Sequence, residues 1–242
     1  MHPPDAYTWK ARIAPVLIVT APVAVYSATA VALTVKLAVG SAVIGAAVLV
    51  LLSQLGRDSG KRLEPELFER WGGRPTERLL SWEIDDPTVV AQRHADVASA
   101  THLNLPTAAE ELDNPVAARE RYSQAIAALR EETRNTDFPL VEAENVNYGF
   151  RRNLLGLRSA GVVACLLVMA ASVITYLVHD DDTNRLAACG VPFLFALALV
   201  VILIAVVRRD WPKTPAIGYA EQLVAAAGTL RRRRKSQIVD PA

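Results

Sequence analysis

Four apolar stretches constrain the fold of this chain more than any other feature of its sequence. They cover residues 13–33, 37–55, 160–178 and 186–207, carry almost no charge, and form two close pairs on either side of a polar block. At about 1.5 Å per residue, an apolar helix of about 20 residues crosses a hydrocarbon layer of about 30 Å. The sequence therefore predicts an all-α membrane protein in which two transmembrane helical hairpins flank a mainly helical cytoplasmic domain.

Basic residues are distributed unevenly around these stretches. Of the 26 lysines and arginines, 24 lie in segments 1–12, 57–159 and 208–242, and only Lys36 and Arg185 lie in the short turns. Basic residues near the ends of membrane spans stay on the cytoplasmic side. We therefore expect cytoplasmic segments at 1–12 and 57–159, a basic cytoplasmic tail at 208–242, and hairpins at 13–56 and 160–207. This topology, with both termini cytoplasmic, predicts a multi-pass protein. The excess of arginine over lysine, 21 to 5, indicates a bacterial source and hence the inner (cytoplasmic) membrane.

Small residues and a proline mark the helix contacts expected inside the membrane. Pro22 interrupts the first stretch and should kink its helix, either as a hinge or as a fixed bend. Ser41 and Gly45 lie four residues apart in the second stretch, a spacing that lets helices approach closely. Such a face fits packing within the chain as well as self-association. No stretch contains an acidic residue, an arginine or a histidine, which argues against an ion-coupled transporter.

The polar block is predicted to form helices separated by turns. One helix should open at 63–65 and stop at Gly72 and Gly73, and others should begin at Pro87, Thr107 and Pro115. Segment 77–84 fits either a helix or a strand. Segment 139–157 should continue as one helix into the third apolar stretch. The helix that begins at Pro115 should bury apolar residues at helical spacing: Val116, Ala118, Tyr122, Ile126 and Leu129.

No motif in the sequence indicates catalysis. Residues 56–62 superficially resemble a phosphate-binding loop, but the glycine spacing is one residue short and Arg62 replaces the serine or threonine. The glycines of this segment more simply allow a turn away from the membrane. His94, Asp96 and His102 are too few for a metal site, and we expect both histidines on the surface. We therefore expect no enzyme activity, no metal and no cofactor.

Two clusters combine arginine with aromatic and asparagine side chains, a composition suited to a nucleotide or an anionic headgroup. The candidate binding residues are Arg70, Trp71, Arg74, Asn145, Tyr148, Arg151 and Arg152. In the alternative, the aromatic rings anchor the block at the membrane interface and the arginines touch lipid phosphates. The basic run at 231–235 predicts contact with anionic lipids, and we expect no DNA binding.

The arrangement of two membrane hairpins around a small cytoplasmic helical block resembles the four-span membrane effectors of bacterial nucleotide-signal anti-phage defence. The resemblance covers the whole chain as architecture, and no family residue is carried over. It implies a protein that assembles into a homo-oligomer or opens a pore when a nucleotide signal arrives, collapsing the membrane potential. The alternative function is a membrane anchor or scaffold that recruits a soluble partner protein through its cytoplasmic domain.

Overall fold

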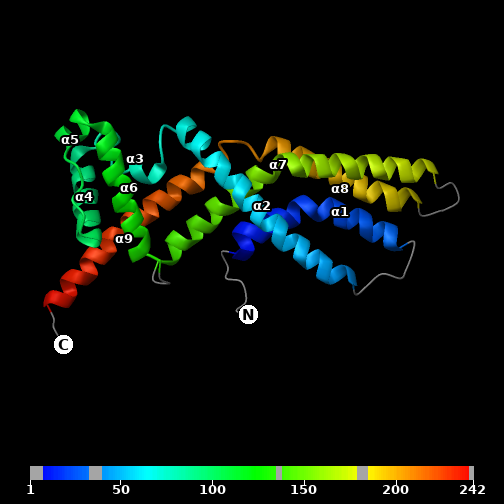
Figure 1. Cartoon of the computed structure of the whole chain (residues 1–242), viewed down its shortest axis with the longest axis horizontal. Coiled ribbons are helices and arrows are strands. Elements are labelled where there is room, and N and C mark those ends of the chain that lie inside the picture. Colours follow the sequence, from blue (N-terminus) through cyan, green and yellow to red (C-terminus); the bar gives the residue numbers. More distant parts are fainter. Residues whose placement is uncertain (1–7, 33–39, 135–137, 179–184, 240–242) are drawn as a thin grey trace. The chain divides into compact units, whose positions relative to one another are not determined.

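The described part of the chain is mainly helical and contains no strand (Figure 1), as the sequence predicts. The computed structural model describes residues 8–32, 40–134, 138–178 and 185–239, without the side chains of residues 8, 30–32, 40–49, 185 and 237–239. The helices are η1 Thr8–Ile13, α1 Ala14–Ala32, α2 Gly40–Arg70, α3 Pro75–Arg78, α4 Pro87–Thr101, α5 Ala108–Asp113, α6 Pro115–Glu132, α7 Pro139–Val178, α8 Arg185–Ala205 and α9 Lys213–Val239.

Three helical segments of the described chain are long and apolar enough to cross a membrane: Trp9–Thr29, Pro139–Val178 and Leu186–Ala205. They contain most of the first, third and fourth predicted stretches. The second predicted stretch, 37–55, is not among the three; it begins outside the described residues and continues into α2. Four spans in two hairpins therefore stay a prediction.

Helix α2 corrects the predicted turn at residues 56–62 and the predicted helix start at 63–65, because one helix runs through both. Gly56 and Gly60 let α2 lie against α7: a methyl group on Gly60 would lie 2.7 Å from Asn153 Oδ1. Pro65 is tolerated inside the helix because it is exposed. The carbonyl four residues before it, on exposed Lys61, can bond to water. The glycines serve close packing here instead of a turn.

The chain divides into two compact units. Unit 1 comprises Met1–Glu64 and Gly149–Pro212, and unit 2 comprises Pro65–Tyr148 and Lys213–Ala242. The boundary falls inside α2 and α7, so each of these helices contributes residues to both units. α7 runs unbroken from Pro139, as the sequence predicts. Unit 2 also includes α9, a segment that the sequence places in a separate basic tail.

Within unit 1, α1, α7 and α8 pack closely around a glycine. A methyl group on Gly161 of α7 would lie 2.9 Å from Leu203 of α8 and 3.1 Å from Val19 of α1. Further along, the hydroxyl oxygens of Tyr26 on α1 and Thr175 on α7 are 2.9 Å apart and share a hydrogen bond. The two contacts follow the chain in the same order, so α1 and α7 run in the same direction.

The core of unit 2 is formed mainly by one face each of α4, α6 and α9. Its buried members are Leu80, Val97, Ala100, Ala118, Tyr122, Ala125, Ile126, Leu129, Val141, Leu223, Val224, Ala226 and Ala227. The predicted burial of Ala118, Tyr122, Ile126 and Leu129 is confirmed. The prediction for Val116 is wrong, because its side chain is 73% exposed. Val116 precedes Ala118 by two residues, which turns it about 200° away around the helix.

The predicted helix starts in unit 2 are confirmed by their caps. The Asp86 carboxylate accepts from Thr88 N–H, and the Asn114 side chain accepts from Ala117 N–H. Thr107 and Glu110 form both hydrogen bonds of a capping box. Each cap satisfies backbone donors that have no partner within the helix. Segment 77–84 is predicted to be either a helix or a strand. Only its first two residues are helical, because α3 ends at Arg78 and turns follow it.

Candidate functional site

A pocket of about 210 Å³ opens on the surface of unit 2. It lies between the segment that follows α2, the short helix α3, the N-terminal half of α6 and one residue of α5. Its lining residues are Gly72, Gly73, Arg74, Glu77, Arg78, Ser81, Glu83, Ile84, Glu111, Pro115, Arg119 and Tyr122. The pocket therefore combines three guanidinium groups with three carboxylates.

Two glycines turn the chain from α2 into the wall of the pocket. Gly72 has φ +79° and Gly73 has φ +119°, backbone conformations that other residues rarely adopt. Their amides bond back to the carbonyls of Glu69 and Phe68, which ends the helix as predicted. Arg78 lies across this turn, and its Nη1 donates to the Trp71 carbonyl oxygen at 2.5 Å. The arginine thus connects α3 to the end of α2.

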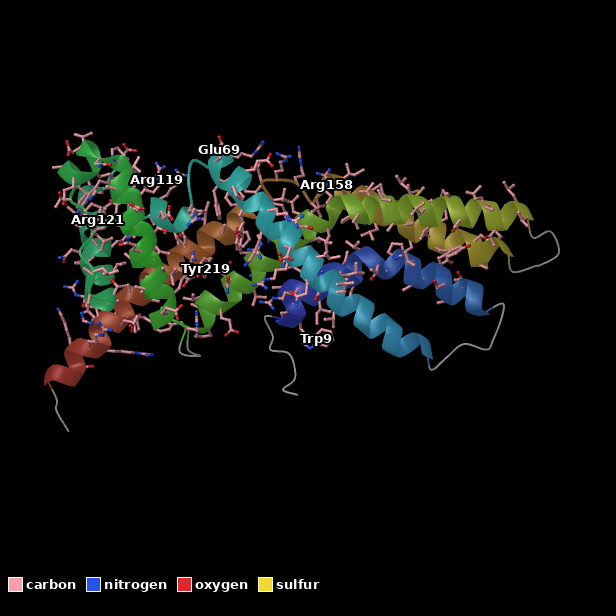
Figure 2. The ribbon with its side chains drawn as sticks, viewed as in Figure 1. Trp9, Glu69, Arg119, Arg121, Arg158 and Tyr219 are labelled. Atoms are coloured by element: carbon pink, nitrogen blue, oxygen red, sulfur yellow. The ribbon has the colours of Figure 1, made fainter. Side chains whose placement is uncertain are left out.

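The two other arginines of the pocket are less constrained. Arg74 donates to Glu77 Oε1 at 3.3 Å, and its guanidinium carbon lies 5.7 Å from the centre of the Phe68 ring. Arg119, labelled on α6 in Figure 2, is exposed and forms no hydrogen bond or ion pair with any residue that the structure describes. Its five N–H donors are available to a ligand.

Glu111 forms the polar floor of the pocket together with three donors. Its carboxylate accepts from Ser81 Oγ at 2.6 Å, from Trp82 N–H at 2.9 Å and from the Tyr122 hydroxyl at 2.8 Å. Partial burial raises the pKa of Glu111, but these three hydrogen bonds outweigh it and hold the pKa below its ordinary value. Glu111 is therefore a carboxylate at neutral pH whose ionised form is stabilised by three hydrogen bonds.

His94 lies behind this floor and corrects the expectation of a surface histidine. Only 9% of the residue is exposed, and its Nε2 lies 2.6 Å from the Leu80 carbonyl oxygen. Its ring meets Trp82 and Tyr122 edge to face, with centroids at 4.9 and 5.7 Å. Burial lowers the pKa of His94, against the opposing effects of the Leu80 carbonyl and Glu111. The described residues contain no cluster that could hold a metal ion.

The predicted binding residues of the first cluster lie in different settings. Arg74 lines the pocket, whereas Arg70 is exposed at the end of α2. Trp71 is 4% exposed and packs edge to face on Phe68 with ring centroids 5.9 Å apart. Its ring is therefore part of the interior, and its buried Nε1 has no hydrogen-bond partner among the described residues.

The predicted binding residues of the second cluster lie along α7. Asn145 and Tyr148 belong to unit 2 and are partly exposed. Arg151 belongs to unit 1, where its Nη1 donates to the Trp211 carbonyl at 3.1 Å and its guanidinium carbon lies 5.1 Å from the Trp211 ring centre. Arg151 is thus held against the segment that follows α8.

Arg152 belongs to a buried polar layer in unit 1. Its side chain is 8% exposed, pairs with Glu64 of α2, and donates to Asn153 Oδ1 at 3.1 Å. Asn153 in turn donates to the Ala11 carbonyl at 2.8 Å. This layer joins η1, α2 and α7, and Arg152 is a structural partner within it.

The predicted helix-packing residues are placed only in part. Pro22 lies inside α1 and is buried. Ser41 and Gly45 lie in α2, but their side chains are outside the described part of the chain.

The basic run at 231–235 forms the end of α9, and several of its arginines have partners in unit 2. Arg231 donates to Asp96 at 2.8 Å. Arg234 donates to the Ser99 carbonyl at 2.6 Å and to His102 Nε2 at 2.9 Å. Lys235 is exposed and forms no such contact with the described residues. The run therefore contributes to the packing of α9 as well as to the surface charge.

No known protein family, curated protein or solved structure matches this chain. The residues of the pocket must therefore be judged on their geometry. Sequence reasoning missed Arg78, Glu111, Arg119 and Tyr122 because they come from three separate segments with no fixed spacing. The one signal that pointed to the region was Arg74 beside two glycines.

Proposed function

We propose that the protein is a multi-pass component of a bacterial inner membrane, with both termini and unit 2 on the cytoplasmic side. The observation that carries this proposal is a single polar layer in unit 1. Ala11 lies just before α1, Glu64 follows the apolar part of α2, and Arg152 and Asn153 precede the apolar part of α7; these four are linked by hydrogen bonds and an ion pair. Arg151, next to Arg152 on α7, donates to the carbonyl of Trp211, which follows α8.

The layer supports four spans because each apolar stretch has its basic end on the side of the chain that leads to the layer. Lys10 and Arg12 precede the first stretch, Arg57 follows the second, Arg158 precedes the third, and Arg208 follows the fourth. Basic residues grouped at one level correspond to the cytoplasmic face. The opposite ends of the stretches would then form the outward turns of two hairpins.

The surface of unit 1 supports contact with lipid. Leu167 on α7 is 66% exposed, and Leu194 on α8 is 63% exposed, within segments made almost entirely of apolar residues. Apolar surface of this extent is unfavourable in water and favourable against acyl chains. A lipid-facing bundle explains this exposure without any partner protein.

Topology is tested by reporter fusions. A phosphatase that is active only outside the cytoplasm, fused after Asp182, is expected to be active. The same reporter fused after Asn104, in the loop between α4 and α5, is expected to be inactive, and a fluorescent protein fused there is expected to fluoresce. Phosphatase activity after Asn104 would overturn the proposed orientation.

We propose further that unit 2 regulates the membrane part, as a signal-gated or partner-gated effector. The supporting observation is α7, one unbroken helix of 40 residues that contributes to both units. A helix without a linker transmits displacement at one end to the other. The scaffold alternative needs no such continuity, since a flexible linker would recruit a partner equally well.

Gating and scaffolding differ in one measurable consequence. If the protein is an effector, inducing it together with its genomic neighbours should depolarise the cells, as read by a potential-sensitive dye. Expression of the chain alone serves as the control for leakage. A constant membrane potential under all these conditions would contradict the proposal of a pore-forming effector and favour the scaffold function.

A further inference from the structure

We propose that the pocket of unit 2 binds a small phosphate-bearing anion, with Arg119 as its main contact and Arg74 and Arg78 beside it. The proposal concerns unit 2 alone. It holds or fails independently of the membrane topology, because binding can be measured on the detergent-solubilised chain. If unit 2 regulates the membrane part, the same pocket supplies the ligand class to which it responds.

The pocket contains more hydrogen-bond donors than the described residues use. Arg119 forms no hydrogen bond or ion pair with them, and Arg78 uses only Nη1 for a hydrogen bond to them, on the Trp71 carbonyl. Arg74 has a 3.3 Å contact to Glu77 and a cation–π contact with Phe68, and its side chain is 55% exposed. Because Arg74 uses one N–H on Glu77, its other donors remain available to a ligand while this contact is kept.

Two of the three carboxylates of the pocket already accept from donors of the chain. Glu111 accepts three hydrogen bonds, and Glu77 is paired with Arg74. Glu83 is the exception, because its exposed carboxylate has no partner among the described residues. Glu83 should therefore weaken binding of an anion, which gives the proposal a second, opposite-signed test.

The number of guanidinium groups favours phosphate over carboxylate. One carboxylate is satisfied by a single bidentate arginine, whereas a phosphate presents three peripheral oxygens and a charge near −2. Arginine provides planar paired donors that match these oxygens. The volume of about 210 Å³ suits a phosphate or pyrophosphate group with a small substituent.

Isothermal titration of the full chain in detergent with sodium pyrophosphate tests the proposal. Binding is expected for the natural chain, and Arg119→Gln should weaken it about tenfold, since charge-assisted hydrogen bonds are lost. Glu83→Gln should strengthen it. The matched control is Arg121→Gln on the same helix (Figure 2), because Arg121 pairs with Glu110 at 3.1 Å and does not line the pocket.

Three results would overturn the proposal: no heat of binding for pyrophosphate, equal effects of the Arg119 and Arg121 variants, or equal binding of citrate. Titration with inorganic phosphate, and flotation with phosphatidic acid vesicles, distinguish a soluble phosphate from a lipid headgroup as the source. Because Arg119 forms no hydrogen bond or ion pair with the described residues, its variant should melt like the natural chain. That measurement separates lost binding from lost folding.

Discussion

Glu111, Tyr122 and His94 show how single residues determine the wall of the pocket. Tyr122 donates to Glu111, and the His94 ring packs against Tyr122 and Trp82. Hydrogen bonds to a carboxylate favour its charged form, whereas burial disfavours a charged histidine. The cluster is therefore built for an ionised glutamate beside a neutral histidine.

Tyr122→Phe removes one donor from Glu111 without changing the shape of the core. We expect the free energy of unfolding of unit 2 to fall by about 1.5–3 kcal/mol, the usual net value of a hydrogen bond to a charged group. Thermal melting of the purified chain measures this. Additive effects of Tyr122→Phe and Glu111→Gln in the double variant would contradict the contact.

His94 should make unit 2 sensitive to mild acid. Burial holds the pKa of His94 below its ordinary value of 6.5, so the unfolded chain binds a proton that the folded chain does not. His94 therefore does not lower the free energy of unfolding above about pH 6.5. As the pH falls below 6.5, the unfolded chain takes up the proton first, and the free energy of unfolding decreases. Melting followed by tryptophan fluorescence should show a shallower pH dependence in His94→Gln. An unchanged slope would show that His94 is not the group responsible.

At the scale of helices, the crossing of α2 and α7 in unit 1 depends on glycine. A methyl group on Gly156 would lie 2.5 Å from the backbone nitrogen of Gly60, closer than real contacts allow. Backbone approach of this kind strengthens dispersion contacts between helices without any hydrophobic driving force. The same approach explains why the glycines of α2 do not make a turn.

Gly156→Ala should therefore separate α2 from α7 and lower the stability of unit 1 by about 1–3 kcal/mol, the usual cost of overpacking. Thermal melting in detergent measures the loss. Gly190→Ala on α8 is the matched control, because nothing lies within 4 Å of the added methyl group. It should be neutral or stabilising, since alanine favours helix over glycine. Equal losses in both variants would contradict the proposed crossing.

Arg231 and Lys235 should differ in what they do at the end of α9. Arg231→Gln removes the partly buried pair with Asp96 and should lower the stability of unit 2 by about 1 kcal/mol. Lys235→Gln removes the same charge from an exposed position and should leave the melting temperature unchanged. Equal weakening of binding to anionic vesicles by both variants, without any change in melting, would show that the run serves lipid alone.

At the scale of the whole molecule, the proposed function depends on the orientation of the apolar stretches. The turn at 179–184 contains three consecutive aspartates, Asp180, Asp181 and Asp182, and lies outside the described residues. Acidic residues have little influence on orientation, whereas arginines resist translocation. The orientation of this turn is therefore predicted from the charges of the sequence, and the contacts within the folded chain do not bear on it.

Replacing all three aspartates by arginine should impair translocation of this turn. The phosphatase fused after residue 182 should then lose most of its activity, while replacement by asparagine should leave it active. Immunoblotting checks that the fusions accumulate equally. Full activity of the arginine variant would contradict the proposed outward turn.

The sequence alone predicted much of the fold and little of the pocket. Caps at Asp86, Thr107 and Asn114 are local interactions, so the residues that make them are visible in the sequence. Arg119 and Glu111 are brought to the pocket by packing between segments, which local spacing cannot reveal. Trp71 shows the same limit, because an aromatic ring beside arginines fits a binding surface and a core equally well.

By itself, the sequence determined the helical class, the apolar segments and the capped starts of α4, α5 and α6, because hydrophobic periodicity and capping act over a few residues. Only the tertiary structure decided the continuity of α2 through its glycines, the burial of His94 and the inclusion of α9 in unit 2. Those outcomes depend on which surfaces meet. A glycine that permits a turn also permits close packing, and the neighbouring helix decides between them.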